Sequence, residues 1–189
     1  MNLNWTVGIP AIIAFCLSVV LSPIIIPLLA RLKFGQFVRD DGPQSHLKKT
    51  GTPTMGGLII IPVIIITSLI FVKSSPKTLP ILIAIIGYGF IGFLDDYIKV
   101  VKKRSLGLKA WQKMLGQILV SSVVIYYIIN FTGIGSFVRI PFSGGKEVDL
   151  GGFYIPFLFF ILIATVNSVN LTDGLDGLAS SVTVIVATF

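Results

Sequence analysis

Long apolar runs constrain this chain more than any other feature. A helix needs about 20 apolar residues to cross the roughly 30 Å hydrocarbon layer of a bilayer. Five runs approach or exceed that length: Val7–Ala30, Gly56–Val72, Leu79–Leu94, Met114–Phe131 and Phe153–Val169. A sixth run begins near Leu175. With 54% hydrophobic and only 12% charged residues, the chain cannot bury this surface in one water-soluble core. The sequence therefore predicts an all-α membrane protein, a polytopic transmembrane helix bundle with about six spans in a single domain, residues 1–189.

The basic residues indicate the orientation of these spans. If every run crosses, the connections 31–55 and 95–113 lie on one face, and they hold eleven of the fifteen Lys and Arg residues. Connections rich in Lys and Arg remain on the cytoplasmic side. This predicts a cytoplasmic face for both connections and an extracytoplasmic N-terminus. Because the basic residues are divided between loops that flank spans, and no soluble segment is long enough to present a groove, we expect no nucleic-acid partner.

The outer face is predicted to carry one short element of β structure. Segment Phe137–Leu150 alternates in polarity around Ser143-Gly144-Gly145. Glycine pairs between alternating segments are typical of hairpin turns. We therefore expect a short extracytoplasmic β-hairpin between the fourth and fifth apolar runs.

Acidic residues converge on the predicted cytoplasmic face. Six of the eight carboxylates fall there: Asp40, Asp41, Asp95, Asp96, Asp173 and Asp176. The rule that places Lys and Arg inside says little about Asp, so this convergence is independent information. It indicates a functional site on that face.

The adjacent pair Asp95-Asp96 follows an apolar run of 16 residues, which is about 24 Å of helix. The pair should therefore lie at headgroup depth. One interpretation is structural: the carboxylates solvate a helix end and neutralise Lys99. The other is a site for a divalent metal or for phosphate chemistry, since Mg²⁺ prefers hard oxygen ligands. Adjacent helical residues point about 100° apart, which favours two different roles for the two aspartates.

A second polar group interrupts the apolar sequence at NSVNLTDGLDGLAS. Its oxygen-bearing side chains are spaced three residues apart: Asn167, Asn170, Asp173 and Asp176. Steps of three keep neighbours on one helix face, and the glycines at 174 and 177 permit the backbone to unwind. An ordinary Asp-Gly turn is the alternative. Polar side chains at membrane depth are costly unless they are used, which favours a site.

A third segment, DDGPQSHLKKTGTPTMGG at residues 40–57, combines acids, lysines, threonines and glycines. Glycine amides together with Lys and Thr side chains can cradle phosphate oxygens, although the segment is not a P-loop. Taken singly, Lys48 and Lys49 would more often be topology anchors, and His46 a surface residue.

Taken together, HLKKTGTPTMGG, GFLDDYIKV and NSVNLTDGLDGLA resemble the signature segments of the phospho-N-acetylmuramoyl-pentapeptide-transferase family, in order and spacing over nearly the whole chain. This family is a branch of the polyprenyl-phosphate N-acetylhexosamine-1-phosphate transferases, within glycosyltransferase family 4. Branches that act on UDP-N-acetylglucosamine generally replace the GTPTMGG loop, so the loop favours the muramoyl-pentapeptide branch.

The resemblance implies a reaction at the cytoplasmic side of a bacterial inner membrane. Undecaprenyl phosphate attacks the β-phosphate of UDP-N-acetylmuramoyl-pentapeptide, with Mg²⁺ as cofactor, and gives lipid I and UMP. The expected catalytic residues are Asp95, Asp96 and Asp173, of which Asp96 and Asp173 would bind the metal. The expected substrate-binding residues are Lys48, Lys49, Thr52, Thr54, Asn170 and Asp176. Membrane lipid surrounds such a protein, and a homodimer is left open.

The resemblance also implies further spans, another metal-binding aspartate and a histidine-rich motif that this chain lacks. We therefore expect an N-terminal fragment, truncated inside a span and inactive by itself. Two alternatives remain at this stage. A related UDP-N-acetylglucosamine phosphotransferase would share the aspartates, and a secondary transporter would also use broken helices, but it predicts acids near mid-bilayer and repeat symmetry.

Overall fold

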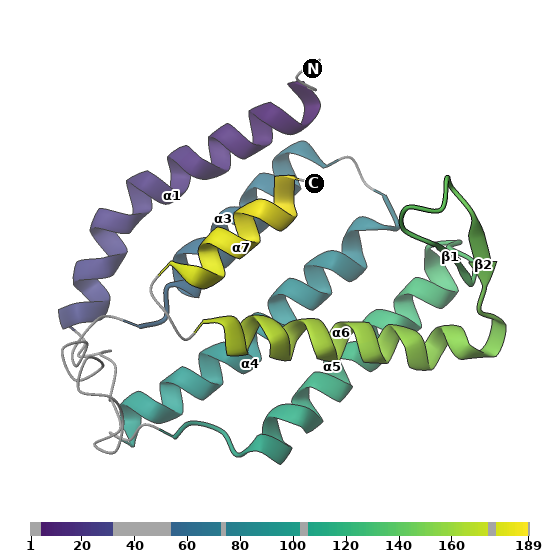
Figure 1. Cartoon of the computed structure of the whole chain (residues 1–189). Coiled ribbons are helices and arrows are strands. Elements are labelled where there is room, and N and C mark those ends of the chain that lie inside the picture. Colours follow the sequence, from purple (N-terminus) through teal and green to yellow (C-terminus); the bar gives the residue numbers. More distant parts are fainter. Residues whose placement is uncertain (1–4, 32–53, 73–74, 103–105, 174–176, 189) are drawn as a thin grey trace. The chain divides into compact units, whose positions relative to one another are not determined.

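The computed structural model describes residues 5–31, 54–72, 75–102, 106–173 and 177–188, which are almost entirely helical (Figure 1). The α-helices are α1 (Trp5–Arg31), α3 (Gly57–Phe71), α4 (Thr78–Val101), α5 (Ala110–Phe131), α6 (Tyr154–Thr172) and α7 (Leu178–Thr188). One short 3₁₀ turn, η1 (Gly151–Phe153), precedes α6. Each predicted span therefore coincides with a helix, and the predicted all-α membrane class is confirmed.

Four of these helices are long and apolar enough to cross a membrane, namely α1, α4, α5 and α6. Helices α3 and α7 have 15 and 11 residues. Two boundaries differ from the predicted runs by four residues or more. Helix α4 continues for seven residues beyond Leu94, and α5 begins four residues before Met114. The apolar pattern missed both extensions because charged or polar residues interrupt them, namely Asp95, Asp96 and Lys99 in α4 and Gln112 and Lys113 in α5.

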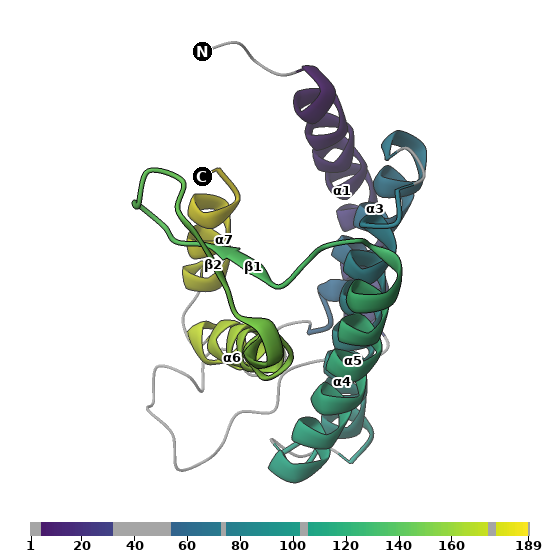
Figure 2. The same ribbon diagram turned by 90° about the vertical axis from the view of Figure 1, so that its right-hand side faces the viewer.

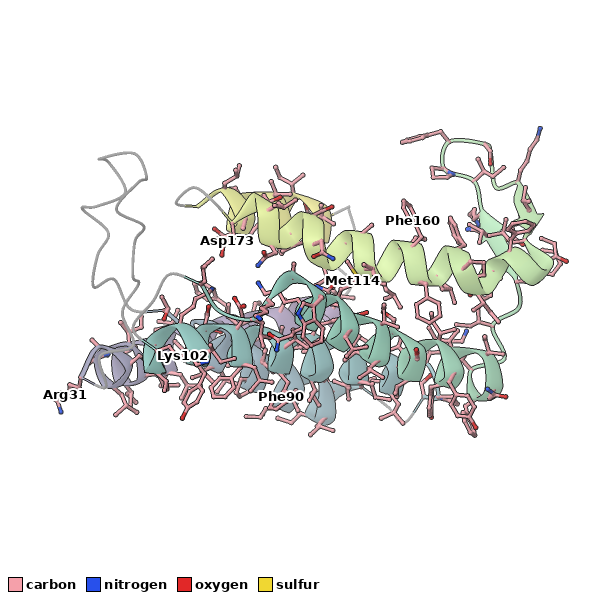
Figure 3. All side chains as sticks on the ribbon, turned by 90° about the horizontal axis from the view of Figure 1, so that it is seen from below. Arg31, Phe90, Lys102, Met114, Phe160 and Asp173 are labelled. Carbon is pink, nitrogen blue, oxygen red and sulfur yellow. The ribbon has the colours of Figure 1, made fainter. Side chains whose placement is uncertain are left out.

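The helices expose apolar side chains along most of their length (Figure 3). Phe15 of α1 is 69% exposed, and Phe160 of α6 is 70% exposed. Exposed apolar surface costs about 25 cal/mol per Å² in water, so surfaces of this kind suit a lipid environment. Together with the four long helices, this exposure shows a membrane protein.

The described residues form two compact units, Met1–Gly116 and Gln117–Phe189. In the first unit, α3 packs against both α1 and α4. Ile59, Val63 and Thr67, spaced four residues apart, form the buried face of α3. A Cβ at Gly89 of α4 would overlap the side chain of Ile61, so the glycine permits the close approach of α3.

The second unit contains the rest of α5, the hairpin, η1, α6 and α7. Its hairpin leads from α5 to α6, as Figure 2 shows for β1 (Phe137–Arg139) and β2 (Glu147–Asp149). The strands are antiparallel, with Val138 opposite Val148. Gly144 and Gly145 have positive φ values of 72° and 93°, which side chains rarely allow. The predicted hairpin and its glycine turn are thus confirmed. The buried face of α5 in this unit is formed by Gln117, Ser121, Val124 and Ile125.

Candidate functional site

The acidic pair lies inside α4, about one and a half turns before the helix ends at Val101, rather than at its terminus. The helix continues because Lys99 binds both acids from the next turn. Its Nζ lies 2.7 Å from Asp95 Oδ2, four residues back, and 2.9 Å from Asp96 Oδ1, three residues back. Pairs at these spacings stabilise a helix. The structural interpretation of the pair is therefore correct as far as Lys99 is concerned.

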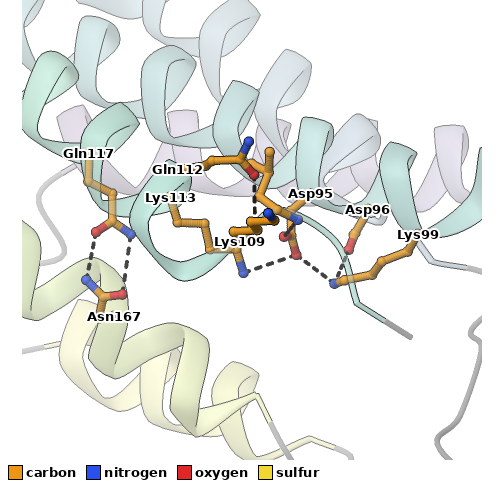
Figure 4. Close-up of polar contacts among 9 residues, drawn as sticks. Asp95, Asp96, Lys99, Lys109, Gln112, Lys113, Gln117 and Asn167 are labelled. Atoms are coloured by element: carbon orange, nitrogen blue, oxygen red, sulfur yellow. Dashed lines mark hydrogen bonds and ion pairs between the residues drawn. The ribbon is translucent and has the colours of Figure 1, made fainter. Parts of the chain in front are cut away.

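Asp95 is the more buried of the two aspartates, with a side chain only 6% exposed. Besides Lys99, its Oδ2 contacts Nζ of Lys113 on α5 at 3.1 Å. Its Oδ1 accepts a hydrogen bond of 2.8 Å from the backbone N–H of Leu108 (Figure 4). A carboxylate inside the fold requires such donors, because burying an unpaired charge is costly. Asp95 thus fixes α4 to the connection that leads into α5 and to the first turn of α5.

Gly107 makes this anchoring possible. A Cβ at this position would lie 2.5 Å from the backbone oxygen of Asp95 and would also collide with its carboxylate. Real Cβ atoms essentially never approach backbone oxygen so closely, so the chain here requires glycine. The segment 106–109 before α5, which carried no signal in the apolar pattern, is therefore shaped by its contact with Asp95.

Asp96 differs from its neighbour in exposure and in partners. Its side chain is 34% exposed, and Lys99 contacts only Oδ1. In the described part of the chain, the second carboxylate oxygen is therefore left for an outside ligand. A partly exposed carboxylate fits Mg²⁺, which usually takes one or two protein carboxylates and keeps water and phosphate in its other positions. Asp95 fits a metal poorly, because three donors already occupy its two oxygens.

The loop before α3 is described only from Thr54 onward; the predicted binding residues Lys48, Lys49 and Thr52 lie outside the described residues. Thr54 is half-buried. The next residue, Met55, is buried and has a φ of 69°, which is uncommon for a residue with a side chain. Strained backbone of this kind persists where the surrounding structure fixes it, and it clusters at functional sites.

We call Asn167, Asn170, Asp173 and Asp176 the polar stripe, and its described members also differ from one another in exposure within the second unit. Asn167 is half-buried and forms hydrogen bonds with Gln117 of α5. Asn170 and Asp173 are exposed, and Asp173 caps α6 with its backbone N–H bonded to the oxygen of Val169 at 3.2 Å. Asp176 lies outside the described residues. The helix therefore ends where the Asp-Gly sequence begins, and α7 starts only after Gly177, whose φ is 78°.

Sequence reasoning missed three contributors: Lys113, Gly107 and Gln117. Lys113 was counted only for topology, although it immediately precedes the apolar run Met114–Phe131. Gln117 stands alone among apolar residues inside a span, and polar residues at such positions are rarely without a partner. That isolation was a usable signal for Gln117. Gly107 had none, because its role depends on a contact with a residue twelve positions earlier.

Comparison with known proteins shows which family the chain resembles. The model of glycosyl transferase family 4 matches residues 78–189, and that of phospho-N-acetylmuramoyl-pentapeptide-transferase signature 1 matches residues 49–61. The chain is 54% identical to the phospho-N-acetylmuramoyl-pentapeptide-transferase of Clostridioides difficile (strain 630), over 95% of this chain and 55% of the relative.

Two further relatives with the same name give similar figures. The protein of Clostridium botulinum (strain Alaska E43 / Type E3) is 52% identical over 99% of this chain and 57% of its own length. That of Caldicellulosiruptor bescii is 53% identical over 94% of this chain and 55% of its own length. The chain spans about half the length of the curated relatives it matches. These matches confirm the resemblance inferred from the three sequence segments.

Proposed function

Since the chain belongs to glycosyl transferase family 4, we propose that the protein containing it transfers phospho-N-acetylmuramoyl-pentapeptide from its UDP conjugate to undecaprenyl phosphate. The products are lipid I and UMP, and the process served is peptidoglycan biosynthesis. The observation that supports this proposal is the match of residues 49–61 to the phospho-N-acetylmuramoyl-pentapeptide-transferase signature. The family resemblance implies that branches acting on UDP-N-acetylglucosamine generally replace this loop.

In the proposed step, an oxygen of the lipid phosphate forms a bond to the β-phosphorus of the nucleotide sugar, and the bond from that phosphorus to UMP breaks. A phosphate monoester has its second pKa near 6, so the attacking group is already largely dianionic at neutral pH. A general base therefore contributes little. Positioning and neutralisation of charge supply most of the catalysis of phosphoryl transfer.

The aspartates of α4 take different parts in this proposal. Asp95 holds Lys99 and Lys113 in place through the contacts of 2.7 and 3.1 Å. Lys99, whose side chain is 35% exposed, supplies a cation next to the reacting phosphates. Asp96 offers its second oxygen to the metal, with Asp173 as the other carboxylate. Mg²⁺, when bound, would neutralise charge on the diphosphate oxygens.

The remaining assignments concern the nucleotide sugar and the membrane. Lys48, Lys49, Thr52 and Thr54 would bind phosphate oxygens, and Asn170 and Asp176 the nucleotide end. The distribution of Lys and Arg favours an inner-membrane protein with its site on the cytoplasmic side and its N-terminus outside. The undecaprenyl chain would then remain in the bilayer while its phosphate reaches the α4 carboxylates.

The test uses the full-length protein reconstituted with undecaprenyl phosphate and Mg²⁺. UDP-N-acetylmuramoyl-pentapeptide and UDP-N-acetylglucosamine are supplied in separate reactions, and UMP release is measured together with the lipid product. We expect release with the first nucleotide sugar only. Release with UDP-N-acetylglucosamine alone would assign the protein to the other branch, and release with neither would refute the transferase assignment.

Point variants then test the residue roles. Asp96→Asn and Asp173→Asn should each reduce turnover by at least about a hundredfold, since each removes a charge from the reaction centre with little change of volume. Asp149→Asn is the matched control, because it removes the same charge from the exposed hairpin. Near-normal turnover in either of the first two variants would show that the metal site is elsewhere.

A further inference from the structure

Two membrane spans of the second unit are joined by a reciprocal pair of side-chain amides. Nδ2 of Asn167 on α6 donates to Oε1 of Gln117 on α5 at 2.8 Å, and Nε2 of Gln117 donates back to Oδ1 of Asn167 at 3.4 Å (Figure 4). Nδ2 of Asn167 also donates to the backbone oxygen of Ile163 at 2.8 Å. Each amide therefore acts as donor and acceptor. We refer to Gln117 and Asn167 as the amide pair.

The amide pair is well placed to define the orientation of α6. One hydrogen bond permits a side chain to swing, whereas two antiparallel bonds between planar amides fix both the rotation and the depth of the helices that carry them. Gln117 is 4% exposed, so water does not compete strongly for it. By contrast, no residue of α6 in the described part of the chain is buried. Apolar packing within the unit thus constrains α6 only weakly, and the amide pair has correspondingly more influence.

Asn167 is also the first member of the polar stripe. At about 1.5 Å rise and 100° per residue, Asn170 lies about 4.5 Å further along the axis and is rotated by about 60°, and Asp173 lies about 9 Å further and is rotated by about 120°. The stripe therefore turns around the helix. Its first member faces α5, while Asn170 and Asp173 are exposed and have no side-chain hydrogen bond among the described residues.

We propose that Gln117 is a positioning residue for the transfer reaction: by holding Asn167, it sets the rotation and depth of the last turns of α6 and hence the direction in which Asn170 and Asp173 meet the nucleotide sugar. This rests on the proposed function, because only a ligand at these two side chains makes their direction matter. Gln117 touches no substrate. It acts through α6.

The alternative is that the amide pair only stabilises the bundle. The two roles differ in kinetics. Loss of stability lowers the amount of active enzyme, so the maximal rate falls while both KM values stay constant. Misdirected Asn170 would instead weaken binding of the nucleotide sugar, misdirected Asp173 would in addition lower turnover, and binding of undecaprenyl phosphate would stay unchanged. A displacement of about 1 Å in a positioning group can reduce turnover by up to about a hundredfold, so the effect should be measurable.

The test compares four forms of the full-length protein in the UMP-release assay. Gln117→Leu removes both bonds of the pair. The exchanged form, Gln117→Asn with Asn167→Gln, keeps the combined length of the two side chains and can form the pair again. Asn130→Leu is the matched control. It also replaces an amide on α5, but among the described residues this amide donates only to the backbone oxygen of Tyr126 in its own helix.

We expect Gln117→Leu to raise KM for the nucleotide sugar at least about tenfold, with KM for undecaprenyl phosphate within about twofold of the unmodified protein. The exchanged form should recover most of the loss, and Asn130→Leu should match the unmodified protein. Equal changes in both KM values, a fall in maximal rate alone, or no recovery in the exchanged form would overturn the positioning role while the proposed function stands. No UMP release by the unmodified protein would overturn the proposed function, and this role with it.

Discussion

The contact between Asp95 and Lys113 can be measured as a coupling free energy. Asp95 has a side chain only 6% exposed, and Lys113 Nζ lies 3.1 Å from its Oδ2. Lys113 is a better probe than Lys99, because Lys99 keeps Asp96 at 2.9 Å when Asp95 is changed. The perturbations are Asp95→Asn, Lys113→Met and the two together. Their non-additivity isolates the pair from other effects of each change.

The expected magnitude follows from burial. A hydrogen bond to a charged group contributes about 1.5–3 kcal/mol, whereas an exposed ion pair contributes about 0.2–1 kcal/mol. Here the carboxylate is buried but the lysine is 28% exposed, so water screens one partner. We therefore expect a coupling of about 1.5 kcal/mol. Asp95→Asn alone should cost about 3 kcal/mol, since it leaves two ammonium groups beside a neutral amide.

The assay is denaturant titration of the purified full-length protein in detergent, with fluorescence of Trp111 as the signal. Trp111 lies two residues before Lys113 on α5 and is 62% exposed. Every other tryptophan of the full-length protein, Trp5 included, is replaced by Phe so that one reporter remains. Lys102→Met is the control, because it removes an exposed lysine just after α4 ends. Additivity of the Asp95 and Lys113 changes to within about 0.5 kcal/mol would refute the ion pair.

Three further predictions follow from local geometry. Gly107→Ala should cost about 2 kcal/mol in the free energy of unfolding, because its Cβ would overlap Asp95, whereas Gly92→Ala on α4 meets no atom within 4 Å and should be nearly neutral in the same titration. The Ser136 hydroxyl and the Gly151 N–H hold the pKa of Asp149 below its usual 3.8. A carboxylate with a lowered folded-state pKa stabilises the fold above its unfolded pKa, so hairpin stability should fall as the pH drops through and below about 3.8. The measurement is a pH titration of the unfolding midpoint, and it would contradict this prediction if Ser136→Ala behaved like the unmodified protein. For sidedness, in a Cys16-free protein a cysteine at Ser143 should react with a membrane-impermeant thiol reagent in intact cells while one at Ser45 should not, and equal labelling would overturn the topology.

The fold was predictable from sequence because apolar length alone decides which segments can cross a bilayer. Helix ends were harder. The run that stops at Leu94 continues as helix to Val101, since Lys99 neutralises two acids at helical spacing. The hairpin was predictable in detail, because Gly144 and Gly145 supply the positive φ values that its turn requires. Local chemistry thus predicted the turn, and ion pairing within the helix moved the boundary.

For the predicted site residues, spacing gave part of the local geometry but not the contacts. Spacing indicated that Asp95 and Asp96 point in different directions, and their exposures of 6% and 34% agree with that prediction. Spacing could not indicate which one faces inward, because this depends on Lys113 and on the backbone of Leu108, which follow in a later segment. The partner of Asn167 lies fifty residues away along the chain and was likewise beyond any local pattern.

The same division of roles occurs in both units, although they share no residue. In each, one motif residue is turned inward and bonded to α5: Asp95 to Lys113, and Asn167 to Gln117. In each, the next polar residue of the motif is more exposed, Asp96 in one case and Asn170 in the other. An inward polar side chain at membrane depth must find a partner, so it orients its helix as a consequence of its own burial. A motif with one inward-facing and one exposed polar residue therefore contains both the side chain that can meet a ligand and the contact that orients that side chain. A loss of activity on substitution does not by itself distinguish the ligand-binding role from the orienting role.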